Sequence, residues 1–291
     1  MRILITIPHY FHKSGDVSKP LPSSYGSLND DLERRAASLQ DTVTSLHQLF
    51  GFPQAMIRVA DRTTIPANQS MQCEIHVVVV TVQHQHLLHE AELGSQSCHH
   101  CIVDHDPSEL GFACQRVLRD RWGNYDIYGF LEDDLAIRDP WFFEKLRWFN
   151  GHVGDECVLL PNRYELSMTQ LYQKCYLDGD LAERVTQPFQ DISVMPELSS
   201  TVLGKGVRLV RPLNPHSGCF FLTAAQMKKW ISSPTFGVAT SAFVGPLESA
   251  ATLGVMTQFR VYKPAPENAS FLEIQHAGER FARLIRRRQA P

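Results

Sequence analysis

The sequence predicts an α/β protein built on a mostly parallel central sheet. Two stretches carry this prediction, "RILITIP" at 2–8 and "EIHVVVVTV" at 74–82. The four successive valines leave the second stretch without a polar face, so both of its faces must be covered. Helical and strand patterns also alternate through residues 1–165. This alternation favours parallel strands joined by right-handed crossovers.

The other elements of this first part follow from periodicity and from end signals. Apolar residues recur at helical spacing after Asn29 and Asp30, either of which can serve as the N-cap, and Gly51 ends the run. Asp139 and Pro140 form a second helix start, with proline at the first helical position. These patterns predict helices over 32–50, 107–122 and 139–149, and strands over 125–131 and 157–162.

The second part of the chain changes character. Its apolar runs and end signals predict strands over 207–213 and 218–224, helices over 224–233 and 246–256, and a C-terminal helix over 277–288. No internal repeat or low-complexity segment interrupts it. We therefore expect one α/β unit over residues 1–165 that carries a smaller C-terminal portion, residues 166–291, of the same domain.

Composition narrows the functional class. The chain has 291 residues and a net charge of -3, so it has no general attraction for nucleic acid or an anionic membrane. No apolar run approaches the roughly 20 residues of a membrane span, and the first residues do not read as a secretory signal. Seven cysteines, an odd and scattered set, do not make a disulfide framework. These features predict a cytoplasmic protein.

Three consecutive carboxylates, Glu132, Asp133 and Asp134, follow the strand predicted over 125–131. Adjacent negative charges need either full hydration or a cation. In open parallel sheets, ligands bind beyond the carboxyl ends of the strands. If the extended geometry persists, Glu132 and Asp134 face one side and Asp133 the other. This favours a Mn²⁺ or Mg²⁺ site at Asp134; the alternative is a solvated acidic turn before the next helix.

Several motifs occur in a recognisable order along the chain: "IPHYF", "LGFACQRVLRD", "EDD", "SGCFFLTA", "GPLESAATLG" and "IQHAGER". Together they resemble the GT-A class of nucleotide-sugar-dependent glycosyltransferases. The resemblance implies a GT-A (Rossmann-like), mostly parallel central sheet flanked by helices. It also implies a metal-dependent hexosyltransferase or related enzyme. The donor would be a nucleoside-diphosphate sugar, with UDP or GDP favoured, and residues 1–165 would bind it. Residues 166–291 would form the acceptor-binding and C-terminal portion of the same GT-A domain, and the acceptor hydroxyl is not identified.

The resemblance implies roles for the acidic triplet and for the C-terminal motif. Asp134 would be the direct metal ligand, while Glu132 and Asp133 would contact the donor. His276 would close the metal shell, since imidazole is an acceptable ligand for Mn²⁺. Arg280 would meet a donor phosphate. The alternatives are an exposed loop histidine at 276 and an arginine at 280 that begins a basic helix face.

Glu248 is the candidate general base. It follows a Gly-Pro turn near a predicted helix start, and the resemblance gives this position to the catalytic acidic residue of inverting members. One base can activate an acceptor hydroxyl in an inverting transfer. A helix N-terminal glutamate placed only by the helix dipole is the alternative. A retaining mechanism would need no base here.

The nucleotide base is expected near Pro8, His9 and Tyr10, where the first strand ends and an aromatic ring can flank it. Asp61 and Arg62 could likewise approach the nucleoside, although surface positions suit them equally well.

The acceptor is expected near His216, Ser217 and Gly218, because "NPHSGCFFL" resembles the strand that borders the acceptor pocket. A glycine that serves only a turn before a buried strand fits this segment as well.

Segment 84–105 is rich in histidine and contains a Cys-x-x-Cys between Cys98 and Cys101. It lacks a second ligand pair at zinc-finger spacing, so we expect a polar loop there. A nucleotidyltransferase is disfavoured, because "HYFHKSGDVSKP" has too few glycines for a phosphate loop. A non-catalytic nucleotide-sugar-binding or scaffold protein on the same sheet stays open.

Overall fold

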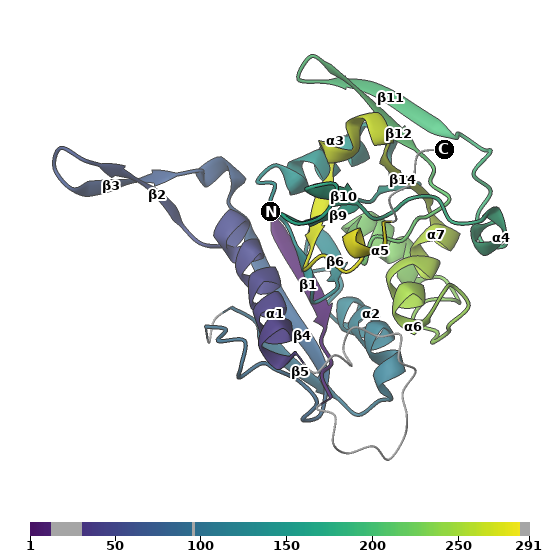
Figure 1. The fold of residues 1–291 in the computed structure, drawn as a ribbon, viewed down its shortest axis with the longest axis horizontal. Helices are drawn as coiled ribbons and strands as arrows, with labels where there is room; N and C mark the ends of the chain where they lie inside the picture. The colour runs from purple at the N-terminus through teal and green to yellow at the C-terminus, as the bar shows by residue number, and fades with distance from the viewer. Residues whose placement is uncertain (13–30, 95–96, 286–291) are drawn as a thin grey trace.

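A computed structural model of the chain describes residues 1–12, 31–94 and 97–285. Its central sheet has five strands in the order β13-β6-β1-β4-β5 (Figure 1). Four of them run parallel: β1 (Arg2–Pro8), β4 (Glu74–Val82), β5 (His99–Val103) and β6 (Ile127–Leu131). The fifth, β13 (Cys219–Thr223), lies antiparallel to β6 at one edge. The predicted α/β class with a parallel-rich sheet is confirmed.

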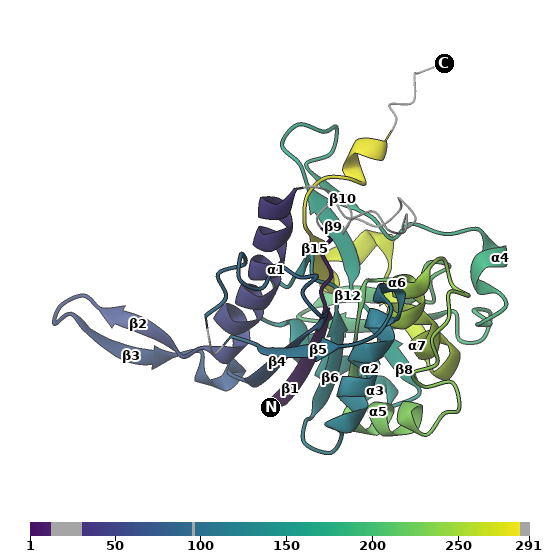
Figure 2. The ribbon, with the colours of Figure 1, turned by 90° about the horizontal axis from the view of Figure 1, so that it is seen from below.

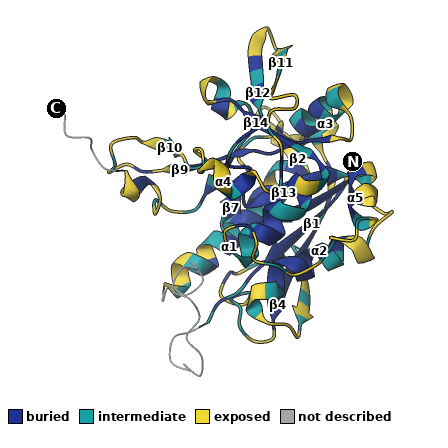
Figure 3. Cartoon of the chain, turned by 90° about the vertical axis from the view of Figure 1, so that its right-hand side faces the viewer, coloured by how far each residue is buried: buried dark blue, intermediate teal, exposed yellow. Residues whose placement is uncertain are grey.

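The strands at the centre of this sheet are buried (Figure 3), because apolar side chains cover both of its faces. On one face Ile3 and Val79 belong to a buried cluster with residues of α1 (Leu32–Leu46) and α3 (Phe142–Val153). On the other face Leu4 and Val78 pack with residues of α2 (Leu110–Asp120), α5 (Ala224–Ile231) and α7 (Gly254–Gln258). Successive valines of β4 therefore serve two different cores, as the sequence predicts.

Two smaller sheets carry the rest of the chain. One has the order β10 (Lys174–Tyr176), β9 (Asn162–Leu166), β15 (Glu273–His276) and β7 (Leu135–Ala136). The other has the order β11 (Glu197–Val202), β12 (Lys205–Val210), β14 (Arg260–Pro264) and β8 (Cys157–Leu159). β7 begins directly after the acidic triplet, and its Leu135 pairs with His276 of β15. This pairing joins the middle of the chain to its C-terminal segment.

A separate hairpin of β2 (Gln54–Arg58) and β3 (Thr63–Ala67) projects from the body of the protein (Figures 1 and 2). It leaves from a π-helical turn, η2 (His47–Gly51), and returns through η3 (Gln69–Met71). The sequence pattern did not predict it. Short 3-10 or helical turns complete the fold at η4 (Pro107–Glu109), α4 (Glu183–Thr186) and η6 (Pro266–Phe271).

The structure corrects three expectations. The N-cap of α1 is Asp31, which accepts a hydrogen bond from the backbone N–H of Arg34; Asn29 and Asp30 lie outside the described residues. Residues 99–103 form β5, not a loop, because they complete the sheet beside β4. The expected helix over 277–288 is replaced, as far as residue 285, by a bend and the turn η7 (Ala282–Leu284), since Gly278 takes a φ of +89°.

The helix predicted over 246–256 is interrupted. It consists of α6 (Pro246–Glu248), a π-helical turn η5 (Ser249–Leu253) and then α7. In the part of the chain that the structure describes, no helix combines the length and apolarity needed to cross a bilayer.

Gly129 offers a test of how tightly the central sheet is packed. A Cβ at this position of β6 would lie 2.6 Å from Cδ1 of Ile5 and 2.9 Å from Cδ1 of Phe221. Gly129→Ala should lower the free energy of unfolding by about 1–3 kcal/mol through overpacking. Gly151→Ala in α3 is the control. A Cβ added at Gly151 would have no heavy atom of the described residues within 4 Å, apart from its own helix backbone. That control should stabilise the helix by about 0.5–1 kcal/mol. Urea unfolding that gave equal effects for both variants would contradict the packing argument.

Candidate active site

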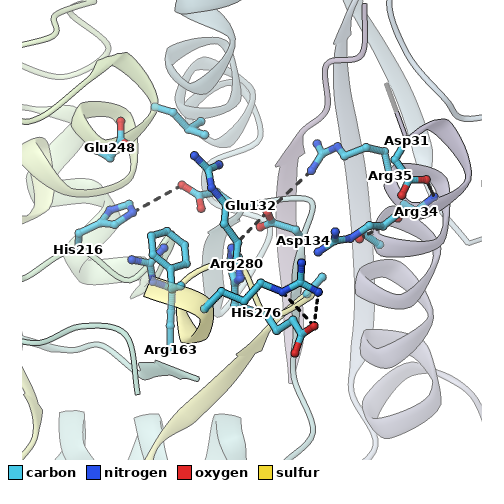
Figure 4. A pocket seen from close by; sticks show the side chains of 16 residues that line it. Asp31, Arg34, Arg35, Glu132, Asp134, Arg163, His216, Glu248, His276 and Arg280 are labelled. Carbon is cyan, nitrogen blue, oxygen red and sulfur yellow. Dashed lines mark hydrogen bonds and ion pairs between the residues drawn. The ribbon is translucent and has the colours of Figure 1, made fainter. Parts of the chain in front are cut away.

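A cavity of about 520 Å³ opens at the carboxyl end of β6 (Figure 4). Its walls come from α1, the end of β6, β9, α6 and the segment after β15. The sequence-predicted residues that line it are Glu132, Asp134, His216, Glu248, His276 and Arg280. Six residues chosen from motifs far apart in the sequence therefore meet at one cavity, at the edge of the sheet where ligands of parallel sheets bind.

Asp133 points away from the cavity into the protein. Its Oδ2 lies 2.6 Å from Nη2 of Arg35 and 2.5 Å from Nδ1 of His9. The backbone N–H of Leu87 donates to Nε2 of His9 at 3.0 Å, so the ring proton is on Nδ1 and is donated to Asp133. Burial would raise the pKa of Asp133, but Arg35 and His9 outweigh it and bring the pKa to about 2. Asp133 thus acts as a charged anchor.

Glu132 faces the cavity with little solvent around it. Burial, followed by the charge of Asp134, raises its pKa to about 8. Its backbone N–H donates to the carbonyl of Gly218 at 3.0 Å. A Cβ on Gly218 would lie 2.5 Å from Oε2 of Glu132, and the φ of this residue is +63°. Gly218 is therefore required by the close approach of Glu132 as well as by its own backbone conformation.

Asp134 and His276 face each other at the cavity, with 3.5 Å between Oδ2 and Nε2. The other ring nitrogen of His276, Nδ1, lies 3.0 Å from Oε1 of Glu165, a fully buried carboxylate. Glu165 also accepts hydrogen bonds from the backbone N–H groups of Phe281 and Ala282. Burial alone would raise the pKa of Glu165, but these hydrogen bonds keep it below the ordinary value. The carboxylate therefore orients the imidazole and leaves Nε2 toward the cavity.

This arrangement suits a divalent cation. A histidine that binds a metal commonly donates its second ring N–H to a carboxylate, as His276 does to Glu165. Oδ1 of Asp134 is buried and has no hydrogen-bond partner among the residues that the structure describes. In the described ranges, no group of three or more His, Cys, Asp and Glu side chains is arranged to hold a metal. The protein thus offers two facing ligand atoms, an incomplete set that suits a cation completed by substrate oxygens and water.

Arg163 reaches the cavity from β9 and is held by a buried ion network. Its Nε lies 2.9 Å from Oδ1 of Asp178, and Nζ of Lys263 lies 2.8 Å from Oδ2 of the same carboxylate. Burial would raise the pKa of Asp178, but Lys263 and then Arg163 lower it to about 2. Lys263 also donates to the carbonyl of His216. The network fixes both a cation and a histidine of the cavity wall.

Further arginines enter from the two ends of the chain. Arg34 and Arg35 come from the first turn of α1, while Arg280 and Arg283 follow β15. The guanidinium group of Arg34 passes directly beside Gly278, so this side chain lies against the C-terminal segment. Guanidinium groups bind phosphate oxygens well, often through two parallel hydrogen bonds. The cavity mouth is therefore suited to a phosphorylated ligand.

Glu248 and His216 form the opposite wall. Oε2 of Glu248 is buried, and no group within residues 1–12, 31–94 and 97–285 forms a hydrogen bond with it. Nδ1 of His216 lies 2.9 Å from Oγ1 of Thr252, and its Nε2 lies 3.9 Å from Oε1 of Glu132. Burial, followed by the charge of Arg163, lowers the pKa of His216 well below its ordinary value. A neutral imidazole and an unpaired carboxylate thus face the same space.

The remaining predicted residues do not line the cavity. Pro8 and His9 are buried, and Tyr10 is half-buried at the end of β1. Ser217 is buried and donates from Oγ to the carbonyl of Pro161 at 2.8 Å. Asp61 and Arg62 lie in the exposed turn of the β2–β3 hairpin. The expectation that these two residues approach the nucleoside does not fit their position, because the hairpin points away from the body (Figure 1).

Sequence reasoning missed several residues of the site. Arg163, Glu165 and Asp178 lie in a segment without a recognised motif, and Arg34 and Arg35 read as ordinary charges on a helix. The signal that could have found the first group is an alternation of charged residues in "NRYEL", where a strand would place Arg163 and Glu165 on the same face. Their burial depends on contacts from distant parts of the chain.

Comparisons with known proteins give little guidance. No family model matches the sequence, and no curated protein does. The solved structures that resemble it include the crystal structure of S. aureus TarS, with 11% sequence identity and a TM-score of 0.49. That match covers 96% of this chain and 37% of the TarS chain, so the present chain spans about a third of it. Similarity at this level does not support any assignment of function, which depends instead on the residues of the site.

The Asp178 network gives a pH-dependent prediction. Asp178→Asn leaves Lys263 and Arg163 without their buried counter-charge, so the free energy of unfolding near neutral pH should fall by about 3–5 kcal/mol. The pKa of Asp178 is about 2, against an ordinary 3.8. The carboxylate therefore stabilises the fold above pH 3.8, and this contribution is lost as the pH falls toward 2.

Urea unfolding at a series of pH values checks this prediction. The difference between wild type and Asp178→Asn should be constant above pH 4 and shrink by about 2 kcal/mol toward pH 2. Asp180→Asn, an exposed acidic neighbour, is the control and should stay within about 0.5 kcal/mol of wild type. A difference that grew on acidification would contradict the assigned sign.

Proposed function

We propose that this chain is a metal-dependent glycosyltransferase that moves a sugar from a nucleoside-diphosphate sugar to an acceptor hydroxyl. The observation that carries the proposal is the facing pair of Asp134 and His276 at the cavity, with His276 oriented by Glu165. Arginines surround this pair, and the unpaired carboxylate of Glu248 belongs to the same cavity. Acid, imidazole and guanidinium groups in this combination suit a diphosphate carried by a divalent cation.

The metal would be Mn²⁺ or Mg²⁺, held by Asp134 and His276. When bound, such an ion stabilises the negative charge that develops on the leaving diphosphate. Hard oxygen ligands suit both ions, and the histidine favours Mn²⁺ of the two. The pKa of Glu132 is about 8, and a cation bound near it would favour the charged carboxylate, whose negative charge the cation would neutralise. Of the three consecutive carboxylates, Glu132 and Asp134 would thus serve the cation and its ligand, while Asp133 is the buried anchor.

The arginines would bind and orient the donor. Arg34 and Arg280 come from opposite ends of the chain to the mouth of the cavity, where they can contact phosphate oxygens. Arg163 lies deeper, fixed by Asp178, and adds positive charge near Glu132. Fixed cations of this kind position a substrate without being reorganised during the reaction. The diphosphate group of UDP or GDP suits this set of arginines.

Glu248 would act as the general base of an inverting transfer. Its Oε2 has no hydrogen-bond partner in the structure, so it is available to accept a proton from an acceptor hydroxyl. His216 and Glu132 would border the acceptor and the donor sugar. The alternatives are a retaining glycosyltransferase and a non-catalytic protein that binds nucleotide sugars. The experiments below distinguish them from an inverting enzyme.

Asp134→Ala tests the metal site. Removing this carboxylate should abolish the increase in affinity for a nucleoside-diphosphate sugar that Mn²⁺ gives to wild type, because one of two protein ligands is lost. Calorimetric titration with UDP- and GDP-sugars, with and without Mn²⁺, measures it.

Two variants serve as a control and a second test for the metal site. Asp120→Ala removes an exposed aspartate at the end of α2 and should leave the metal effect unchanged. Glu165→Gln is a second test rather than a control: it alters the partner of His276 and of the Phe281 and Ala282 backbone N–H groups, and should weaken metal binding by about 10–100-fold. A metal dependence that survives in Asp134→Ala would exclude the assigned site.

Glu248→Gln tests the base. The variant keeps size and hydrogen bonding but cannot take the proton, so kcat should fall by about 10²–10⁴ while donor affinity stays near that of wild type. Transfer and donor hydrolysis should be assayed separately, with NMR reading the anomeric configuration of the product.

Glu109→Gln is a matched control, since Glu109 ends a Pro-Ser-Glu turn much as Glu248 ends Pro-Leu-Glu, but it does not line the cavity. Retention of most transfer activity in Glu248→Gln, or a product with the donor's configuration, would favour a retaining enzyme. Donor binding without any transfer or hydrolysis in wild type would favour the binding protein.

A further inference from the structure

The β2–β3 hairpin has no role in the cavity, yet it exposes a concentration of apolar side chains. Its strands pair only with each other among the sheets of the described residues. The side chains exposed on the hairpin and at its base are Phe52 (46%), Met56 (62%), Ile57 (69%), Val59 (84%) and Ile65 (43%). An exposed apolar group of this kind marks an interaction surface more often than a chance feature.

A hairpin of two strands is only marginally stable in water, and a sheet needs three or more strands with an apolar face to be stable by itself. The β2–β3 pair leaves the body and has neither a third strand nor a helix on its faces (Figure 2). Its residues nevertheless favour strand pairing. Met56 pairs with Ile65 and Ile57 with Thr64, and isoleucine and threonine are enriched in strands. An added strand would supply the missing stabilisation.

The two edges of the hairpin differ. β3 contains Pro66, which cannot donate a ladder hydrogen bond and so protects that edge from further pairing. β2, "QAMIR", contains no proline and no lysine, and its five residues run without interruption. The free edge of β2 is therefore the one at which another strand can be added.

The sequence of β2 is self-complementary. In an antiparallel pairing about a two-fold axis through Met56, Gln54 lies opposite Arg58 and Ala55 opposite Ile57, so no like charges meet. Met56 already pairs with Ile65 within the hairpin. Two copies would then form a continuous row of four apolar side chains, Ile65 and Met56 from each chain, across a four-stranded sheet.

From these observations we propose that the chain associates with a second copy of itself through β2, by antiparallel pairing centred on Met56. The result is an isologous interface, in which the same segment is used by both partners. It doubles the hairpin sheet to four strands and covers the unprotected edges of both β2 strands. The cavities of the two chains stay open, since the hairpin does not contribute to them.

Sedimentation velocity of the full chain over a wide concentration range tests the proposal, and a dimer is the expected species. Met56→Lys puts two positive charges opposite each other on the axis and should weaken dimerisation by about tenfold or more. Met56→Glu should do the same. An equimolar mixture of the two variants should recover the dimer, because lysine then faces glutamate, and only pairing centred on residue 56 predicts this recovery.

Thr64→Lys adds the same charge on β3 and is the control, expected to dimerise much as wild type does. Thermal unfolding of each variant verifies that Met56, which is largely exposed, can be replaced without loss of the fold. A wild type that stays monomeric at all concentrations overturns the proposal, and this would also be the result if the hairpin served a different protein. Dimerisation that is unaffected in Met56→Lys, or a mixture that associates no better than its components, overturns it equally.

Discussion

The interaction on which the site depends is the buried contact of Asp133 with Arg35 and His9. It joins the end of β6 to α1 and to the end of β1, three elements that the chain places far apart in sequence. Asp133 is held inside the protein by these contacts, while Glu132 and Asp134, its neighbours where the chain turns after β6, line the cavity. One buried carboxylate thus anchors the turn that carries Glu132 and Asp134.

The second constraint is the pairing of β7 with β15. It places Leu135 opposite His276, and the backbone N–H of Ala277 donates to the carbonyl of Asp134 at 2.8 Å. The histidine is therefore positioned by backbone hydrogen bonds as well as by its contact with Glu165. Such support from strands gives a ligand set more precise geometry than loops can. Several buried charged groups lie at this edge of the sheet. An unpaired buried charge destabilises the fold, and groups of this kind are found mainly at binding and catalytic sites.

The cavity and the β2–β3 hairpin present different kinds of surface. The cavity is lined by charged groups whose charges are only partly paired within the protein, as for Arg280 and Glu248, whereas the hairpin exposes apolar groups in a regular ladder. The first arrangement suits a small polar ligand, and the second suits another protein strand. Separating them lets association and ligand binding vary independently.

The acidic triplet does not continue β6 as an extended strand, since Asp133 and Asp134 form a turn. The sequence by itself determined the α/β class and the central strands, because local periodicity governs these features. It also selected Asp134, His276, Glu248 and Arg280. Only the tertiary structure revealed Arg163, Glu165, Asp178 and the partners of Asp133, since their burial depends on contacts between separate segments, such as Glu165 with His276, 111 residues apart, and Arg35 with Asp133, 98 residues apart. The same holds for Asp61 and Arg62. Their local sequence could not show that the β2–β3 hairpin carries them away from the cavity. The direction of the hairpin depends on how η2 and η3 join it to the rest of the fold.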